Sequence, residues 1–195
     1  MTKGRLEAFS DGVVAIIITI MVLELRVPHG ETLSSLRPLA PVFLSYVLSF
    51  LYVGIYWNNH HHLLHAAHHV DGRILWANLH LLFWLSLFPF ATHWLGETGF
   101  AAWPLAVYGA VLMLAAIAYT ILVRALLARH GGDSVLARAI GSDRKGNFSL
   151  ACYVLGIVLA ATGNRWPAFA VYGVVALIWV VPDLRIVRAL EQSKD

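Results

Sequence analysis

The sequence predicts an all-α membrane protein in which one domain, residues 1–195, contains six transmembrane helices. Of its 195 residues, 59% are hydrophobic and 13% are charged. A typical soluble domain has about 45–50% apolar and about 25% charged residues. The apolar residues also occur in long runs that are separated by short charged connections. Runs of about 20 apolar residues match the hydrocarbon core of a bilayer.

Six segments approach this length, and proline or glycine residues punctuate the connections between them. The expected spans are residues 6–27, 39–57, 73–95, 101–127, 147–163 and 167–187. The first could be mistaken for a signal peptide. However, Asp11 interrupts its apolar core, and Glu24-Leu25-Arg26 stands where a small-residue cleavage site would be expected. We therefore expect a retained first helix.

The basic residues indicate the orientation of the chain. With the N-terminus inside the cell, the inner segments contain eleven of the 14 Lys and Arg residues, and only Arg26, Arg37 and Arg165 are outside. Cytoplasmic loops are enriched in Lys and Arg. The sequence therefore predicts a multi-pass protein of the plasma membrane, embedded in the lipid bilayer, with both termini in the cytoplasm.

The composition supports neither nucleic-acid binding nor disulfide redox chemistry. No dense Lys and Arg cluster occurs away from the membrane flanks, so we expect no nucleic-acid partner. The single cysteine, Cys152, has no second cysteine with which to form an intrachain disulfide.

A run of histidines follows the second span, where residues 58–69 read NNHHHLLHAAHH. The spacing of His61, His65, His68 and His69 places imidazoles on one helical face, as in the histidine boxes of membrane desaturases. Such a diiron site needs about eight histidines from three boxes, and the others here are scattered. A polar helix end at the membrane surface is the favoured interpretation, with no metal and no cofactor. A membrane metal oxidoreductase remains the alternative.

The start of the first span carries a more specific pattern. Arg5, Phe9, Ser10 and Asp11 precede an apolar run without an intervening loop. This Arg-x-x-x-Phe-Ser-Asp motif resembles the transmembrane-protein-175 family of potassium channels. The second span, which ends in Tyr-Trp57-Asn-Asn-His-His61, and the third, which contains Leu-Trp-Ala-Asn78-Leu, are similar to that family in the same order.

The resemblance implies a homotetrameric channel for potassium ions, not an enzyme, in which the first helix lines the pore. No Thr-Val-Gly-Tyr-Gly-like filter occurs in the sequence, so pore side chains would restrict the ions. At about 100° per residue, one face of the helix carries the expected pore-lining positions. They are Ile16, Thr19, Ile20 and Leu23, with Ile16 as the expected constriction and hydrophobic gate.

Asp11 lies about 140° from Ile16 around the helix, so we expect it to point into the protein. The expected structural polar clamp consists of Arg5, Phe9, Ser10, Asp11, Trp57, His61 and Asn78. A secondary transporter is a third hypothesis, because Pro89 could mark a broken helix in the third span.

Overall fold

The computed structural model describes residues 2–67, 69–130 and 144–180, and within these ranges the regular structure is entirely helical. The α-helices are α1 (Lys3–Leu23), α2 (Ala40–His65), α3 (Gly72–Ser86), α4 (Phe88–Glu97), α5 (Ala102–His130), α7 (Arg144–Ala161) and α8 (Arg165–Val180), and a short 3-10 helix, η1 (Leu33–Leu39), precedes α2. The all-α prediction is confirmed.

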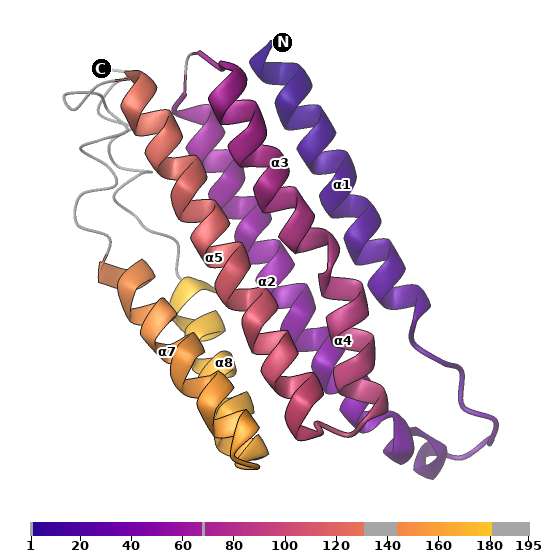
Figure 1. Ribbon diagram of the computed structural model, residues 1–195. Coiled ribbons are helices and arrows are strands. Elements are labelled where there is room, and N and C mark those ends of the chain that lie inside the picture. Colours follow the sequence, from indigo (N-terminus) through magenta and orange to yellow (C-terminus); the bar gives the residue numbers. More distant parts are fainter. Residues whose placement is uncertain (1, 68, 131–143, 181–195) are drawn as a thin grey trace.

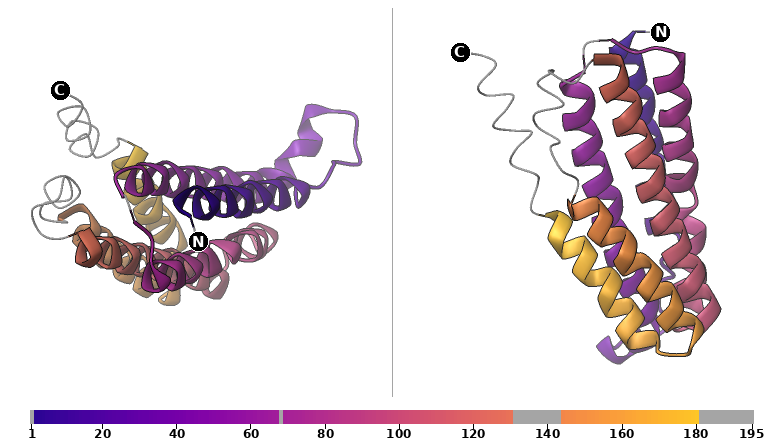
Figure 2. Two further views of the ribbon diagram at one scale, coloured as in Figure 1. Left: turned by 90° about the horizontal axis from the view of Figure 1, so that it is seen from above. Right: turned by 60° about the vertical axis from the view of Figure 1, so that its left-hand side comes forward.

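The long helices lie side by side in one elongated bundle (Figure 1). Helix α1 packs against α2, α3 and α4 at one edge. The pair α7–α8 packs at the opposite edge, along the half of α5 that is nearest its N-terminus (Figures 1 and 2). Among the described residues, helix α1 therefore has neighbours on one side only.

Local sequence explains where several helices begin and end. Pro41 lies in the first turn of α2, where its missing N–H costs no hydrogen bond. The Asp71 side chain caps α3 by accepting hydrogen bonds from the backbone N–H groups of Arg73 and Ile74, both at 3.0 Å. Helix α4 ends at Glu97, and Gly99 and Phe100, in the turn that follows it, have φ angles of 58° and 63°.

The third predicted span, residues 73–95, corresponds to one apolar segment, Gly72–Glu97, which consists of two helices. Helix α3 ends at Ser86, and α4 begins at Phe88, with Leu87 between them. Pro89 lies in the first turn of α4 and cannot donate a hydrogen bond to the preceding turn. The two helices nevertheless form one segment across the bundle. The second predicted span was too short, since α2 continues through the histidines to His65.

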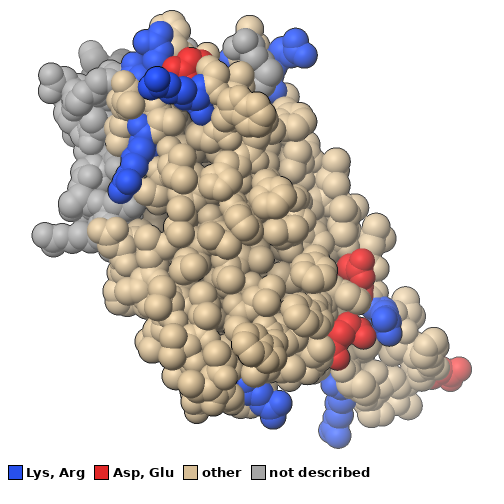
Figure 3. Space-filling view, viewed as in Figure 1, with Lys and Arg blue, Asp and Glu red and all other residues tan. Residues whose placement is uncertain are grey.

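Four segments of the described chain are long and apolar enough to cross a membrane: Lys3–Leu23, Leu33–His65, Gly72–Glu97 and Ala102–Arg129. Helices α7 and α8 are shorter apolar helices, and the predicted part of the sixth span beyond Val180 lies outside the described residues. Figure 3 shows that the charged side chains on this face lie near the two ends of the bundle. The chain is thus a multi-pass membrane protein.

Hydroxyl groups and aromatic rings hold the middle of the bundle together. The Tyr52 hydroxyl donates to the backbone carbonyl of Tyr172 at 2.7 Å, which joins α2 to α8. Thr92 on α4 donates to Ser49 on α2 at 2.6 Å, and the Ser49 and Tyr108 hydroxyls are 3.0 Å apart. Because lipid offers no hydrogen-bonding partner, polar side chains between membrane helices are satisfied by one another.

Candidate pore helix and its polar network

Helix α1 has one buried face and one exposed face. Its buried face is spaced by three or four residues and consists of Leu6, Ser10, Val14, Ile17 and Met21. On the other face, Ile16 is 59% exposed and Leu23 is 77% exposed. Ile20 is 42% exposed, and Gly12 and Thr19 are also exposed. All four positions predicted to line a pore therefore lie on the face of α1 that no part of the described subunit covers.

A buried chain of hydrogen bonds attaches the other face of α1 to α2 and α3. The Asn78 amide donates to the Ser10 hydroxyl oxygen at 3.0 Å, and Ser10 donates to the Leu6 carbonyl at 2.8 Å. The Asn78 carbonyl oxygen lies 2.7 Å from Nε2 of His60. Because that oxygen can only accept, the arrangement assigns the proton of His60 to Nε2. Each polar group of Asn78 is therefore paired.

Asp11 does not lie in this buried network, contrary to the sequence-based expectation. Its side chain is exposed on the subunit surface, where Oδ1 accepts a hydrogen bond of 2.9 Å from Nε1 of Trp57. Trp57 is itself 46% exposed and stacks on His61, with ring centroids 6.2 Å apart. Adjacent side chains on an α-helix point in directions about 100° apart around the helix axis. Ser10 can therefore face the interior while Asp11 faces the surface.

The other expected members of the clamp also lie outside the buried chain. Arg5 is exposed and forms no ion pair with Asp11 in the described structure, and Phe9 is 51% exposed. His61 is exposed, whereas its neighbour His60 is 7% exposed and bonds to Asn78. Ser10 and Asn78 are thus the predicted residues that the structure brings together in the interior. His60 was missed, although it lies beside His61 in the same run.

The histidine run forms a stacked surface at the end of α2. His61 stacks on His65 with a centroid separation of 6.1 Å and an interplanar angle of 20°. Among the described residues, no group of three or more His, Cys, Asp or Glu side chains has an arrangement that could hold a metal ion. His68 of the predicted box lies outside the described residues.

Thr19 presents its hydroxyl oxygen on the exposed face of α1. The hydroxyl donates its hydrogen to the Ala15 carbonyl at 2.7 Å. Its oxygen lone pairs therefore remain available to a cation, and Thr19 lies nearly one turn beyond Ile16 along the same face.

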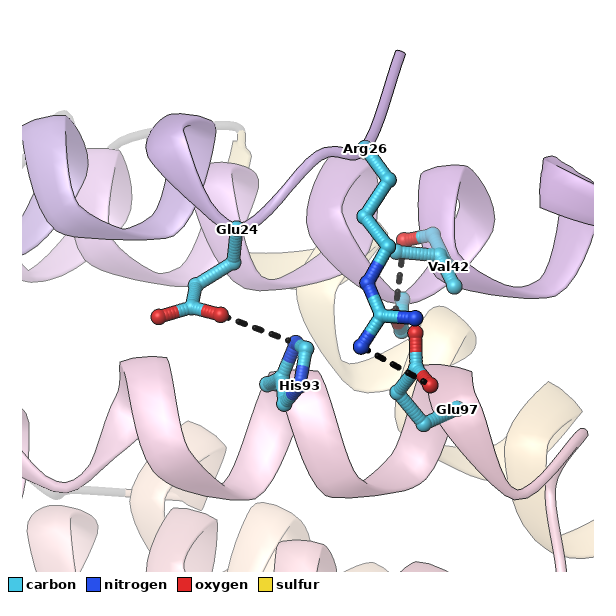
Figure 4. A network of polar contacts seen from close by, with 6 residues as sticks. Glu24, Arg26, Val42, His93 and Glu97 are labelled. Atoms are coloured by element: carbon cyan, nitrogen blue, oxygen red, sulfur yellow. Dashed lines mark hydrogen bonds and ion pairs between the residues drawn. The ribbon is translucent and has the colours of Figure 1, made fainter. Parts of the chain in front are cut away.

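Two ion pairs join the other end of α1 to α4 (Figure 4). Nδ1 of His93 lies 3.1 Å from Oε2 of Glu24, and the Arg26 guanidinium lies 3.6 Å from the Glu97 carboxylate. Although Nδ1 of His93 lies close to the Glu24 carboxylate, this buried nitrogen makes no properly directed hydrogen bond within the described residues. A broad open recess between α1 and α4 includes Glu24, His93 and Glu97 in its lining. The sequence gives no indication that Glu24 lies beside His93 or that Arg26 lies beside Glu97, because the sign of a charge does not identify its partner on another helix.

The chain matches known proteins over the region that contains this network. Residues 5–89 match the family model described as endosomal/lysosomal potassium channel TMEM175. A potassium channel of Chryseobacterium sp. (strain P1-3) is 57% identical over 195 residues, which cover 99% of this chain and 100% of that protein. A human protein named endosomal/lysosomal proton channel TMEM175 is 39% identical over 75 residues, or 32% of this chain and 15% of that protein.

A solved structure has the same fold. The crystal structure of a protein titled a lysosomal potassium-selective channel TMEM175 homologue from Chamaesiphon minutus superposes with a TM-score of 0.77. It is 28% identical in sequence, and the match covers 93% of this chain and 97% of that chain. These relatives are named as channels, and the histidine-box oxidoreductase alternative has no support among them. The chain belongs to the TMEM175 family of channels.

Proposed function

We propose that the protein is a potassium-permeable cation channel in which four identical subunits surround a pore lined by α1. The observation that carries this proposal is the exposed face of α1, where Ile16, Thr19, Ile20 and Leu23 follow one another without a partner helix in the described subunit. A central axis beside this face would bring the four copies of each residue into a ring. The names of the relatives as potassium channels support this choice of ion.

Side chains that line the pore would restrict the passage of ions. The sequence contains no Thr-Val-Gly-Tyr-Gly-like stretch that could form a ring of backbone carbonyls. A ring of four Ile16 side chains presents only methyl and methylene groups, and a narrow apolar neck tends to exclude water and hydrated ions. Thr19 then offers an oxygen next to the neck, where a partly dehydrated cation can rest.

The remaining surface of α1 would join the subunits. Asp11 and Trp57 lie on the outside of one subunit, and a carboxylate at this depth needs a polar partner. Contact between subunits would enclose the Asp11–Trp57 pair and fix α1 relative to its neighbours. The excess of basic residues in the inner segments supports an orientation with both termini in the cytoplasm and a location in the plasma membrane.

Ion flux through reconstituted protein tests the proposal. The full chain is reconstituted into liposomes that contain potassium, and flux is followed with a dye after a potassium gradient has been imposed. We expect potassium flux that exceeds sodium flux under the matching sodium gradient. Absence of flux from liposomes whose protein is shown by crosslinking to be tetrameric would overturn the channel proposal. A crosslinked assembly of another size would overturn the fourfold arrangement alone.

A further inference from the structure

A second feature of the subunit lies far from α1, in a cavity of about 90 Å³ between α2, α5, α7 and α8. We call it the tyrosine cavity. Its walls include Tyr52, Tyr56, Tyr119, Tyr153, Ser149 and Trp179. The volume is several times the ~10–15 Å³ that one water molecule requires.

The cavity wall is mostly apolar, because its polar groups are largely occupied. Ser149 donates to the Lys145 carbonyl at 2.8 Å and accepts from the Trp179 indole at 2.8 Å. Thr120 donates to the Ala116 carbonyl at 3.0 Å, and Tyr119 donates to the Asn59 carbonyl at 3.3 Å. The part of the cavity wall that remains available to a ligand consists chiefly of aromatic rings and methyl groups.

Tyr56 is the exception among these hydroxyl groups. Its side chain is 8% exposed, and its ring packs edge-on against Phe88 and Tyr119. Tyr56 lines the cavity, and its hydroxyl donates no hydrogen bond to another described residue. The hydroxyl is therefore available to donate a hydrogen bond to a ligand. A ligand with an acceptor oxygen, such as the carbonyl of an ester, would supply the missing hydrogen bond.

Two basic residues flank the same cavity. Arg124 lies one helical turn beyond Thr120, on the side of α5 that carries Ala116 and Thr120. It is exposed and forms no ion pair with another described residue. On α7, Lys145 precedes the wall residue Gly146, and its Nζ lies 5.9 Å from the ring of Trp179. Arg124 lies near the C-terminal end of α5, and Lys145 lies at the start of α7.

We propose that the tyrosine cavity binds an acyl chain of an anionic phospholipid from the cytoplasmic leaflet, with the lipid phosphate held by Arg124 and Lys145. The apolar wall accommodates the chain, and Tyr56 donates a hydrogen bond to an ester carbonyl. The positive charges select an anionic headgroup, because basic pockets between helices on the cytoplasmic side attract such lipids. The site does not involve α1, so it is separate from the proposed pore.

Lipid retention by the purified full-length protein tests this proposal. The protein in detergent is incubated with equal amounts of phosphatidylglycerol and phosphatidylcholine, and native mass spectrometry counts the lipids that remain bound. The wild type should retain phosphatidylglycerol preferentially. Arg124→Gln should weaken that retention about fivefold, the equivalent of about 1 kcal/mol per basic residue. Arg73→Gln is the matched control, because Arg73 is an exposed arginine at the start of α3, away from the cavity.

Two variants test the cavity itself without changing charge. Ala116→Leu fills part of the cavity, and Tyr56→Phe removes the hydroxyl while keeping the ring. Both should lower retention of phosphatidylglycerol, and unchanged thermal unfolding of Tyr56→Phe shows that the subunit is intact. Equal retention of the two lipids by the wild type would overturn the proposal. So would unchanged retention in Arg124→Gln or in both cavity variants, or displacement of the lipid by glycerol 3-phosphate, which has the phosphate but no chain.

Discussion

The Asn78 amide on α3 donates a hydrogen bond of 3.0 Å to the Ser10 hydroxyl on α1, and both side chains are at most 1% exposed. This bond fixes the rotation of α1 about its own axis. With Ser10 held inward, Ile16 points about 120° away from it around the helix axis, because six residues correspond to about 600° of rotation. The buried bond thus determines which residues would face the proposed pore.

The first prediction concerns this bond. Ser10→Ala should lower the free energy of unfolding by about 1 kcal/mol, because it leaves the Asn78 amide without an acceptor. Asn78→Leu should cost more, about 2–3 kcal/mol, since it removes the partners of both Ser10 and His60. Denaturant unfolding in detergent measures both values. Ser86→Ala is the control, because its exposed hydroxyl bonds only to Phe83 within the same helix. Equal stability of all three variants would contradict a structural role for the network.

The second prediction concerns Asp11 and Trp57. Asp11→Ala should reduce the fraction of tetramer, because it leaves the Trp57 indole N–H unpaired at the proposed subunit contact. Asp11→Asn keeps an acceptor oxygen and should assemble better than Asp11→Ala. Size-exclusion chromatography with light scattering measures the fraction. A normal tetramer with altered single-channel conductance would instead place Asp11 in the pore.

The third prediction concerns the proposed constriction. Ile16→Asn should raise cation flux severalfold and reduce the preference for potassium over sodium, because a polar neck admits water and more fully hydrated ions. Ile20→Asn and Leu23→Asn should act in the same direction but less strongly. Bilayer recording against the wild type gives both quantities.

The neighbouring residue provides the control for this experiment. Ile17 is 3% exposed, whereas Ile16 is 59% exposed. Ile17→Asn should therefore destabilise the subunit, because it buries an amide without a partner. The part of the Ile17→Asn protein that still assembles into tetramers should conduct ions like the wild type. An intact Ile16→Asn tetramer with unchanged conductance and selectivity would show that Ile16 is not the constriction.

The fourth prediction concerns the other end of α1. Glu24→Gln should lower single-channel conductance at low salt, because the carboxylate raises the local concentration of cations. The difference should nearly vanish at 1 M salt, where the screening length falls to about 3 Å. Glu31→Gln is the control, since Glu31 carries the same charge in the exposed connection after α1. An effect that does not depend on salt would indicate a role for the Glu24–His93 contact in structure only.

The fifth prediction concerns the contact between α2 and α4. A Cβ atom at Gly96 would lie 2.7 Å from both Cα of Val42 and Oγ of Ser45. Gly96→Ala should therefore lower the free energy of unfolding by about 1–3 kcal/mol, as overpacking does. At Gly173 on α8, nothing lies within 4 Å of an added Cβ. Gly173→Ala should be neutral or stabilising by up to about 1 kcal/mol. Thermal unfolding in detergent compares the two, and equal effects would contradict the close approach.

The sequence alone determined the features that depend on local pattern. The long apolar runs indicated helices that cross a membrane, and the spacing of Ile16, Thr19, Ile20 and Leu23 placed them on one face. That face is exposed in the subunit. The ordered motifs also indicated the family. These inferences succeed because hydrophobicity and helical periodicity are properties of neighbouring residues.

Only the tertiary structure decided which polar side chains meet. Ser10 and Asp11 are adjacent, yet one bonds to Asn78 in the interior and the other to Trp57 at the surface. His60, rather than His61, reaches Asn78. The pairing of Glu24 with His93 was likewise not specified by the motifs. Each of these outcomes depends on the rotation and depth at which one helix packs against another. Packing of whole helices sets those two quantities, and a pattern along a single helix does not contain them.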